Sequence, residues 1–568
     1  MAQGKKVMLS TSSSSSSRST GEEGPSIREL LRTALDDKAL YKEYDVLLDN
    51  KDLWALMLVE FSPELAKHTQ EVSVADRLTI EDNVQVELVS KDERRIREGI
   101  AGVLNKAPSQ LTDADYENVT RLDLSGAPIE NIEFLVRLKK LQSLDLSGTK
   151  LTEIGVLSGL KDLRLLGLSK TKVSNISVLA SLTNLESLNL SETPVGDIGI
   201  LSGLSNLGYV DLSDTAVSDI SALSGLTNLQ KLYLTGTKIS SLEALRNLTG
   251  LKHLMVHSTD VSNLETLRGL TGLVRLGVYR THVTNIEPLQ NLIHLQALDL
   301  NETKVSDFGP LKNLTSLRRL YLSGTGITDI GVLSGLTNLQ RLELCGTQVS
   351  DIRVLSGLTN LQELFLHETS TSNLDPLRNL TALVRLGVNR TSVSDIEPLE
   401  NLNRLQALDL NETKVSDVTP LRHLTSLLRL YLSGTQVSDV DPLLSLANLE
   451  RLELRDTPVS DIGVLTGLTN LRWLDLSRTK VSDIGPLSGL TNLQILYLRG
   501  TSVGDISVLS GLISLQELGL SGTKVSDIGV LSWLANLQWL DLSDTLVSGE
   551  QLAELQKALP DLVIGSVK

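Results

Sequence analysis

Twenty copies of a 22-residue unit run from Leu122 to Leu542, and this repeat limits what the chain can fold into. The copies follow one another without an insertion or a deletion, and they share the pattern L-x-x-L-x-L-x-x-x-x-V-x-x-I-x-x-L-x-x-L. A single unit cannot bury its own apolar residues, whereas stacked units can, and each then contacts only its neighbours. The repeat therefore predicts one solenoid, although 568 residues would otherwise suggest several globular domains.

The position of each residue within a copy predicts the direction of its side chain. Successive side chains of a strand point to opposite faces, so Leu144 and Leu146 are expected to point inward and Asp145 outward. The residue at the bend after the strand is Thr in nineteen copies, as in Thr149, and only Ala127 differs. We expect the Thr hydroxyl to bond backbone groups at this bend.

An aspartate row follows the bend in the later copies. Its members are Asp395, Asp417, Asp439, Asp461, Asp483, Asp505 and Asp527. Each lies before a predicted helical turn, so N-capping is the interpretation we favour, and a cation ladder is the alternative. Thr371 replaces the usual Val, Ile or Leu of the core, and its hydroxyl needs a partner such as His367.

The segments before the repeat differ in composition. Residues 1–24 are rich in serine and are expected to be a disordered tail, with an export signal like that of bacterial type III effectors as the alternative. Residues 25–90 are predicted to be a small helical segment, with a short strand near Val84–Leu88. Residues 91–120 are predicted to be an N-terminal helical cap, in which Asp92 begins a helix.

Three stretches resemble a known family. Ile96-Arg-Glu-Gly-Ile100, Leu111-Thr112 and the run from Val119 to Ser125 resemble the helical cap and first repeat of the bacterial internalin-like proteins. The array over residues 121–549 resembles the 22-residue subclass of leucine-rich repeats that includes a regulatory subunit of type 1 protein phosphatase. The resemblance implies an α/β repeat solenoid, a leucine-rich-repeat horseshoe with a parallel concave sheet, capped by helices at both ends. Residues 550–568 would form the C-terminal cap.

Composition restricts the partners and the compartment. The formal charge of −16 argues against a nucleic-acid backbone as the ligand, and no apolar stretch is long enough for a membrane helix. The only cysteine is Cys345, and no apolar region follows Lys5 and Lys6 at the N-terminus. We therefore expect a cytoplasmic protein, with secretion without a cleavable signal peptide as the alternative. The oligomeric state is left open.

Catalysis has little support in the sequence. Gly500 to Gly504 matches the nucleophile pattern G-x-S-x-G, but it is an ordinary repeat bend. His253 and His257 are expected at adjacent outward strand positions, and His367 recurs five copies later. They are interpreted as contact residues, because two neighbouring histidines without a third ligand do not make a metal site. We predict no enzyme, no cofactor and no metal.

The outward strand positions carry the candidate binding residues. The aromatic ones are Tyr209, Tyr233, Tyr279, Tyr321, Phe365, Tyr431, Trp473, Tyr497 and Trp539. A basic row contains Arg275, Arg319, Arg341, Arg385, Arg429 and Arg451, and an acidic row two positions along contains Asp299, Glu343, Asp409, Glu453 and Asp475. Mixed charge with exposed aromatic residues is typical of a protein or peptide interface, although intramolecular pairing of these groups is the alternative.

A second period of 110 residues, or five copies, repeats part of this surface. Arg275, Asp299, Arg319 and Tyr321 return as Arg385, Asp409, Arg429 and Tyr431. The sequence therefore predicts a non-enzymatic scaffold that binds a protein partner on its concave sheet. The alternative is an exported bacterial effector or virulence factor that binds a host protein.

Overall fold

The computed structural model describes residues 44–46 and 88–565. The chain divides into two compact units, and the division falls between Leu229 and Gln230. The predicted serine-rich tail lies outside the described residues, as do the helices expected between residues 25 and 87.

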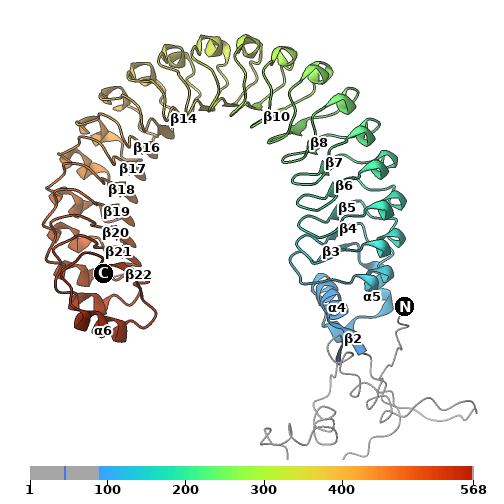
Figure 1. Cartoon of the computed structure of the whole chain (residues 1–568), viewed down its shortest axis with the longest axis horizontal. Coiled ribbons are helices and arrows are strands. Elements are labelled where there is room, and N and C mark those ends of the chain that lie inside the picture. Colours follow the sequence, from blue (N-terminus) through green and yellow to red (C-terminus); the bar gives the residue numbers. More distant parts are fainter. Residues whose placement is uncertain (1–43, 47–87, 566–568) are drawn as a thin grey trace, which may run out of the picture. The chain divides into compact units, whose positions relative to one another are not determined.

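In the part of the first unit that the structure describes, there are a strand pair, two α-helices and the first copies of the repeat (Figure 1). Strands β1 (Tyr44–Val46) and β2 (Leu88–Ser90) pair antiparallel, and β2 overlaps the end of the strand expected near residues 84–88. The helices are α4 (Lys91–Leu104), η2 (Pro108–Gln110) and α5 (Asp113–Asn118). The repeat strands are β3 (Arg121–Asp123), β4 (Ser143–Asp145), β5 (Leu165–Gly167), β6 (Ser187–Asn189) and β7 (Tyr209–Asp211). The 3-10 turns between them are η3 (Glu133–Arg137), η4 (Gly155–Gly159), η5 (Ser177–Ser181), η6 (Gly199–Gly203) and η7 (Ser221–Leu223).

The second unit continues the same alternation. Its strands are β8 (Lys231–Tyr233), β9 (His253–Met255), β10 (Arg275–Gly277), β11 (Ala297–Asp299), β12 (Arg319–Tyr321), β13 (Arg341–Glu343), β14 (Glu363–Phe365), β15 (Arg385–Gly387), β16 (Ala407–Asp409), β17 (Arg429–Tyr431), β18 (Arg451–Glu453), β19 (Trp473–Asp475), β20 (Ile495–Tyr497), β21 (Glu517–Gly519), β22 (Trp539–Asp541) and β23 (Val563–Ile564). Its helices are η8 (Glu243–Leu245), η9 (Glu265–Gly269), η10 (Glu287–Leu289), η11 (Gly309–Asn313), η12 (Gly331–Gly335), η13 (Arg353–Gly357), η14 (Asp375–Leu377), η15 (Glu397–Leu399), η16 (Thr419–His423), η17 (Asp441–Ser445), η18 (Gly463–Gly467), η19 (Gly485–Gly489), η20 (Ser507–Gly511), η21 (Gly529–Trp533) and α6 (Gly549–Ala558).

Within each unit, the repeat strands from β3 to β22 pair in parallel with a constant register. Ser143 of β4 pairs with Leu165 of β5, and Arg319 of β12 pairs with Arg341 of β13, so each residue faces the one 22 positions later. Because the register equals the repeat length, every leucine of one copy stacks on the equivalent leucine of the next copy. Leu320 and Leu342 are fully buried in this way. The chain is thus a leucine-rich-repeat solenoid, as the sequence predicted.

Each strand ends in a tight bend that contains one residue with left-handed backbone. That residue is Gly in eight copies, as in Gly148 with φ 71°, and another residue in twelve, as in Arg390 with φ 55°. The chain then turns through the threonine position. The Thr149 hydroxyl donates to the carbonyl of Leu146 at 2.7 Å, and the same bond recurs in the following copies, for example from Thr413 to Leu410. The predicted role of this threonine is confirmed.

The aspartate row does cap the outer turns, but from one position earlier than an ordinary N-cap. The Asp417 carboxylate accepts from the backbone N–H of Thr419 at 2.8 Å, and Asp461 accepts from Gly463 in the same way. These turns are 3-10 helices of three to five residues. In nine copies an asparagine after the turn completes the outer side, as where Asn448 donates to the carbonyl of Thr425 in the preceding copy at 2.9 Å.

Helix α4 lies against the first repeat strand. Ile96 and Ile100 of α4 are fully buried, and Gly99 comes so close to β3 that an added Cβ would lie 2.8 Å from Leu124. Ser90 is the N-cap of this helix, and its hydroxyl accepts from the N–H of Glu93. The prediction that Asp92 caps this helix is wrong, because the Asp92 carboxylate accepts from the N–H groups of residues 130 and 131 instead.

Two more α-helices, α5 and α6, form where the sequence predicted helices before and after the repeats. Thr112 and Asp115 form the capping box that begins α5. At the C-terminal end, Ser548 caps α6, which contacts η21, and β23 adds to β22. Among the described residues, none of the helices combines the length and the apolar composition needed to cross a membrane.

We predict that α4 stabilises the first repeats as a cap. Ile100→Asp would bury an unpaired charge at a fully buried position and should cost about 3–5 kcal/mol of local stability. Hydrogen exchange should accelerate in β3 and β4. The control is Val103→Asp on the same helix, since Val103 is 51% exposed and its replacement should leave exchange unchanged. Equal protection in both variants would contradict the capping role.

Thr371 has a hydrogen-bond partner, and it is Thr369 rather than the expected His367. The two hydroxyl oxygens lie 2.9 Å apart, both residues are buried, and Thr369 also donates to the carbonyl of Leu366 at 2.8 Å. The extra hydroxyl in the core is therefore satisfied by the threonine ladder of its own copy.

This pair predicts a non-additive effect on stability. Thr369→Val should cost about 1–3 kcal/mol, because it leaves both the Leu366 carbonyl and the Thr371 hydroxyl without a partner. Thr371→Val should cost less than about 1 kcal/mol. The double variant should be more stable than Thr369→Val alone, since it also removes the stranded hydroxyl. Urea midpoints of the four proteins test this, and additive losses would contradict it.

Candidate protein-binding surface

In the second unit, the first and third residues of strands β8 to β22 form a continuous surface that we call the strand face. The strands line the inner side of this curved unit, and the 3-10 turns lie on its outer side (Figure 1). The middle residue of each strand is buried, as in Leu320, whereas the first and third residues, such as Arg319 and Tyr321, reach the surface. The strand face is therefore free of the packing demands that fix the rest of the repeat.

The predicted aromatic residues lie in two columns along the strands. Tyr209 of the first unit, together with Trp473 and Trp539, occupies the first strand position. Tyr233, Tyr321, Phe365, Tyr431 and Tyr497 occupy the third strand position. All of them are half-buried.

Tyr279 does not lie on a strand, and neither do two of the histidines. Strand β10 ends at Gly277, so Tyr279 lies in the bend that follows. His257 and His367 lie in the equivalent bends after β9 and β14. The prediction that these side chains occupy outward strand positions is wrong, because each strand is only three residues long and the alternation stops at the bend.

One aromatic–arginine cluster surrounds Arg341 of β13. The guanidinium lies 5.5 Å from the ring centre of Tyr321 and 5.2 Å from that of Phe365. Its Nε donates to Glu343 at 2.9 Å, and it also pairs with Glu363. Charge and ring stacking thus hold five side chains of three adjacent strands in one arrangement.

An equivalent cluster surrounds Arg451 of β18, five copies later. Its guanidinium lies 5.4 Å from the ring centre of Tyr431 and 3.8 Å from that of Trp473, and its Nε donates to Glu453 at 2.8 Å. Trp473 lies at the position equivalent to Glu363 of the first cluster, and its ring stacks on the arginine as Phe365 does there. The two clusters share their arginine, tyrosine and glutamate at an offset of 110 residues.

A third cluster lies on β19 to β22. The Tyr497 ring is 5.8 Å from Trp473 and 6.4 Å from Trp539, both in edge-on geometry, and the Arg499 guanidinium lies over Tyr497 and Trp539. The Tyr497 hydroxyl donates to Glu517 at 2.7 Å. Burial, together with this carboxylate, raises the pKa of Tyr497 to about 12. The sequence patterns missed Arg499 because they considered strand positions, and Arg499 lies in the bend after β20. Its place in the repeat could have been assigned from Ser477, the equivalent bend residue of the preceding copy.

Two aspartates of the strand face are half-buried without a cationic partner among the described residues. Burial raises the pKa of Asp299 to about 6, despite a hydrogen bond from the N–H of Asn301, and the nearby Glu343 adds to the shift. Burial likewise raises the pKa of Asp409, five copies later, with Glu453 contributing. Each lies beside the tyrosine of its cluster, since Asp299 pairs in register with Tyr321 and Asp409 with Tyr431.

The bend histidines lie over glycines of the next strand. A Cβ on Gly277 would lie 2.2 Å from the His257 ring, and one on Gly387 would lie 2.0 Å from the His367 ring. Burial lowers the pKa of both imidazoles, and the Nδ1 of His257 accepts from the N–H of Tyr279 at 3.0 Å. Burial therefore favours the neutral form of both rings. Within the described part of the chain, no group of three or more His, Cys, Asp or Glu side chains is arranged to hold a metal ion.

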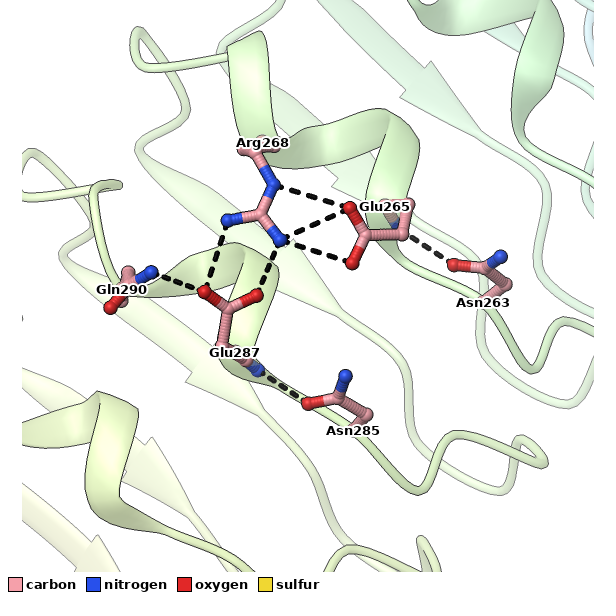
Figure 2. A network of polar contacts seen from close by, with 6 residues as sticks. All are labelled: Asn263, Glu265, Arg268, Asn285, Glu287 and Gln290. Atoms are coloured by element: carbon pink, nitrogen blue, oxygen red, sulfur yellow. Dashed lines mark hydrogen bonds and ion pairs between the residues drawn. The ribbon is translucent and has the colours of Figure 1, made fainter.

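The four arginines predicted as binding residues have few ion-pair partners. Arg275, Arg319 and Arg429 are exposed and form no ion pair with any residue that the structure describes, and Arg385 reaches Glu363 only at 3.7 Å. Arginines of the outer side differ from them. Figure 2 shows Arg268 of η9 held between Glu265 of its own turn and Glu287 of η10, and Arg378 joins Asp375 and Glu397 in the same manner.

The comparisons with known proteins agree with this fold. The family model "Leucine Rich repeats (2 copies)" matches residues 205–247, 293–336, 315–358 and 469–511, and the model "Leucine Rich repeat" matches residues 181–202. No curated protein sequence gives a significant match.

Several solved structures have a similar fold. The functional domain of InlJ from Listeria monocytogenes is 21% identical, with a TM-score of 0.53 over 63% of this chain and 78% of that one. The plant peptide hormone receptor RGFR1 is 20% identical, with a TM-score of 0.55 over 81% and 87%. The Arabidopsis receptor kinase HAESA is 22% identical, with a TM-score of 0.55 over 77% and 80%. The matched segments are leucine-rich repeats, and the chain has a leucine-rich-repeat fold similar to that of InlJ.

Asp299 predicts a pH-dependent stability. A carboxyl whose pKa is raised from about 3.9 in the unfolded chain stabilises the fold fully below that value, and this contribution is lost as the pH rises through about 6. Asp299→Asn keeps an acceptor for the N–H of Asn301 and removes the buried charge. It should therefore be more stable than the wild type by about 1–3 kcal/mol at pH 7.5, and the difference should vanish near pH 4.

Denaturant midpoints at both pH values measure this difference. Asp409→Asn should change stability with the same sign, because its carboxyl is buried in the equivalent place. A stabilisation by Asp299→Asn that persists or grows at pH 4 would contradict the assignment.

Proposed function

We propose that this protein is a non-enzymatic scaffold that holds a protein or peptide partner on the strand face of its second unit. The observation that supports this proposal is the set of aromatic–arginine clusters on that face, around Arg341, Arg451 and Arg499. Aromatic residues and arginine are the residue types enriched at the centres of protein interfaces. None of these side chains is needed to fill the leucine core.

Pre-ordered side chains make this surface suited to binding. The guanidinium groups of Arg341 and Arg451 already stack on aromatic rings and pair with Glu343 or Glu453. Binding therefore loses little conformational entropy in ordering them. Other leucine-rich-repeat proteins supply a parallel, since RGFR1 was solved in complex with RGF2, and HAESA with the peptide hormone IDA and the co-receptor SERK1. Those ligands belong to those receptors, and they illustrate the class of partner that the fold accommodates.

We also propose a cytoplasmic location, with export without a cleavable signal peptide as the competing proposal. The only cysteine, Cys345, is a free thiol, which suits a reducing compartment. Fusing residues 1–30 to a reporter in a secreting bacterium separates the two. Retention of the reporter supports the scaffold, and its export supports an effector that binds a host protein.

The strand face should lose its partner when two equivalent tyrosines are truncated. Full-length protein serves as bait in a pull-down, and the affinity for the captured partner is then measured by calorimetry. Tyr321→Ala/Tyr431→Ala should weaken binding by roughly 2 kcal/mol or more, about 30-fold, because both rings lie in the half-buried clusters.

The matched control is Trp533→Ala. Trp533 is a large aromatic residue that is 75% exposed on the outer turn η21, so its loss should leave affinity unchanged. Circular dichroism and the urea midpoint establish that both variants are folded. Equal weakening by the control, or full affinity in the double tyrosine variant, would place the binding surface elsewhere.

A further inference from the structure

The two clusters around Arg341 and Arg451 belong to larger matching patches. In the first patch, Asn301 accepts from the N–H of Ser323 at 2.6 Å, and in the second patch Asn411 accepts from Ser433 at 2.7 Å. The aspartate, the tyrosine, the glutamate and the stacked arginine keep the same contacts in both. The repetition of 110 residues is thus a repetition of surface geometry as well as of sequence. We name them the first patch (β10–β14) and the second patch (β15–β19).

Each patch contains two arginines in direct register, and only one of them is neutralised. Arg319 pairs in register with Arg341, and Arg429 with Arg451. Arg341 and Arg451 each have a glutamate partner, whereas Arg319 and Arg429 form no ion pair with any residue between 88 and 565. Like charges directly opposite each other on neighbouring strands destabilise a sheet. A negative group placed over the free arginine would relieve that repulsion.

Each of these two free arginines is preceded by another arginine in the same column. Arg275 lies two strands before Arg319, and Arg385 lies two strands before Arg429. In a chain of formal charge −16, this column concentrates positive charge that the protein itself leaves largely unpaired. The third strand position beside it carries Asp299, Glu343, Asp409 and Glu453. A ligand with a continuous polyphosphate backbone would meet these carboxylates, whereas side-chain carboxylates at intervals would meet only the arginines.

We infer that the partner presents an acidic protein segment whose carboxylates contact the two patches at once, through Arg275 and Arg319 in one and Arg385 and Arg429 in the other. This inference rests on the proposed function and names the chemistry of its partner. Five strand steps of ~4.8 Å separate equivalent points by about 24 Å. An extended segment covers that distance with about seven residues at ~3.3 Å each. Contact with the first patch makes contact with the second intramolecular, so the two contacts gain avidity.

The test uses full-length protein and synthetic peptides. The probe is a fluorescein-labelled peptide with two Asp-Glu pairs separated by a Gly-Ser spacer of four, seven or twelve residues, and anisotropy gives its affinity at low ionic strength. The matched peptides carry one pair only, or Asn-Gln in place of Asp-Glu. We expect the two-pair peptide with a spacer of seven residues to bind at least tenfold more tightly than the one-pair peptide, and the neutral peptide not to bind.

Variants assign the contacts. Arg275→Gln/Arg319→Gln and Arg385→Gln/Arg429→Gln should each reduce the two-pair affinity to that of the one-pair peptide, about tenfold, and the four substitutions together should abolish binding. The control is Arg268→Gln/Arg378→Gln, which removes the two paired arginines of the outer side and should leave affinity unchanged. Urea midpoints of all variants establish folding.

Four outcomes overturn the inference. They are equal binding of the neutral peptide, equal loss in the outer-side control, dependence on one patch only, and tighter binding of a single-stranded RNA of 20 nucleotides than of the acidic peptide. The proposed function fails separately. If Tyr321→Ala/Tyr431→Ala releases a captured partner while the four arginine substitutions do not, the scaffold proposal stands and the acidic segment is wrong. If neither set releases that partner, both are wrong.

Discussion

The structure depends on one constraint: each copy of the repeat must satisfy its buried backbone groups through its own bend and through the copy beside it. With a register of 22 residues, backbone N–H groups donate to carbonyls of the neighbouring copy, as from Arg319 to Gln296. The Thr413 hydroxyl donates a hydrogen bond to the carbonyl of Leu410 at the bend, and the Asn448 amide donates to the carbonyl of Thr425 in the preceding copy. An insertion of one residue in any copy would break all of these bonds at once, which accounts for the unbroken spacing of the repeat.

The same constraint decides where function can be placed. The leucines, the bend threonine and the capping aspartate each have a partner that the repeat requires, so none of them can vary freely. The first and third strand positions have no such partner, and the chain places Arg, Tyr, Trp, Asp and Glu there. The outer turns vary as well, but their charged residues pair among themselves, as Arg268 does with Glu265 and Glu287. Unpaired charge is therefore more informative about binding than charge alone.

The sequence predicts the fold because all twenty copies have the same pattern of apolar positions and the same length. Thr149 and Asp417 could be assigned their roles from a single copy, since the partners lie two or three residues away. The strand position of Tyr279 could not be predicted, because nothing in the alternation marks the end of a three-residue strand. The sequence also could not show that the outer turns are 3-10 rather than α-helical, because both kinds of turn have the same capping residues.

The candidate surface could be listed from the sequence, but its pairing could not. All six arginines of the column stand at the same strand position, and they differ only in what lies beside them. Arg341 has Glu343 two residues on and a ring on each side, whereas Arg319 has Tyr321 in place of that glutamate. Whether an arginine forms an ion pair thus depends on its side-chain neighbours on adjacent strands. The sequence pattern along one copy does not show these neighbours.

The free arginines also bear on stability. A sheet with Arg319 opposite Arg341, and with the half-buried Asp299 two strands from Glu343, carries repulsion that a neutral sequence would avoid. The leucine core extends through neighbouring copies on both sides, so the second unit can carry this repulsion without loss of its fold. Side chains held in an unfavourable arrangement by a rigid scaffold are typical of functional surfaces, where a ligand supplies the missing charge. The same unfavourable pair appears twice, five copies apart, and in each case the scaffold around it satisfies every requirement of the repeat.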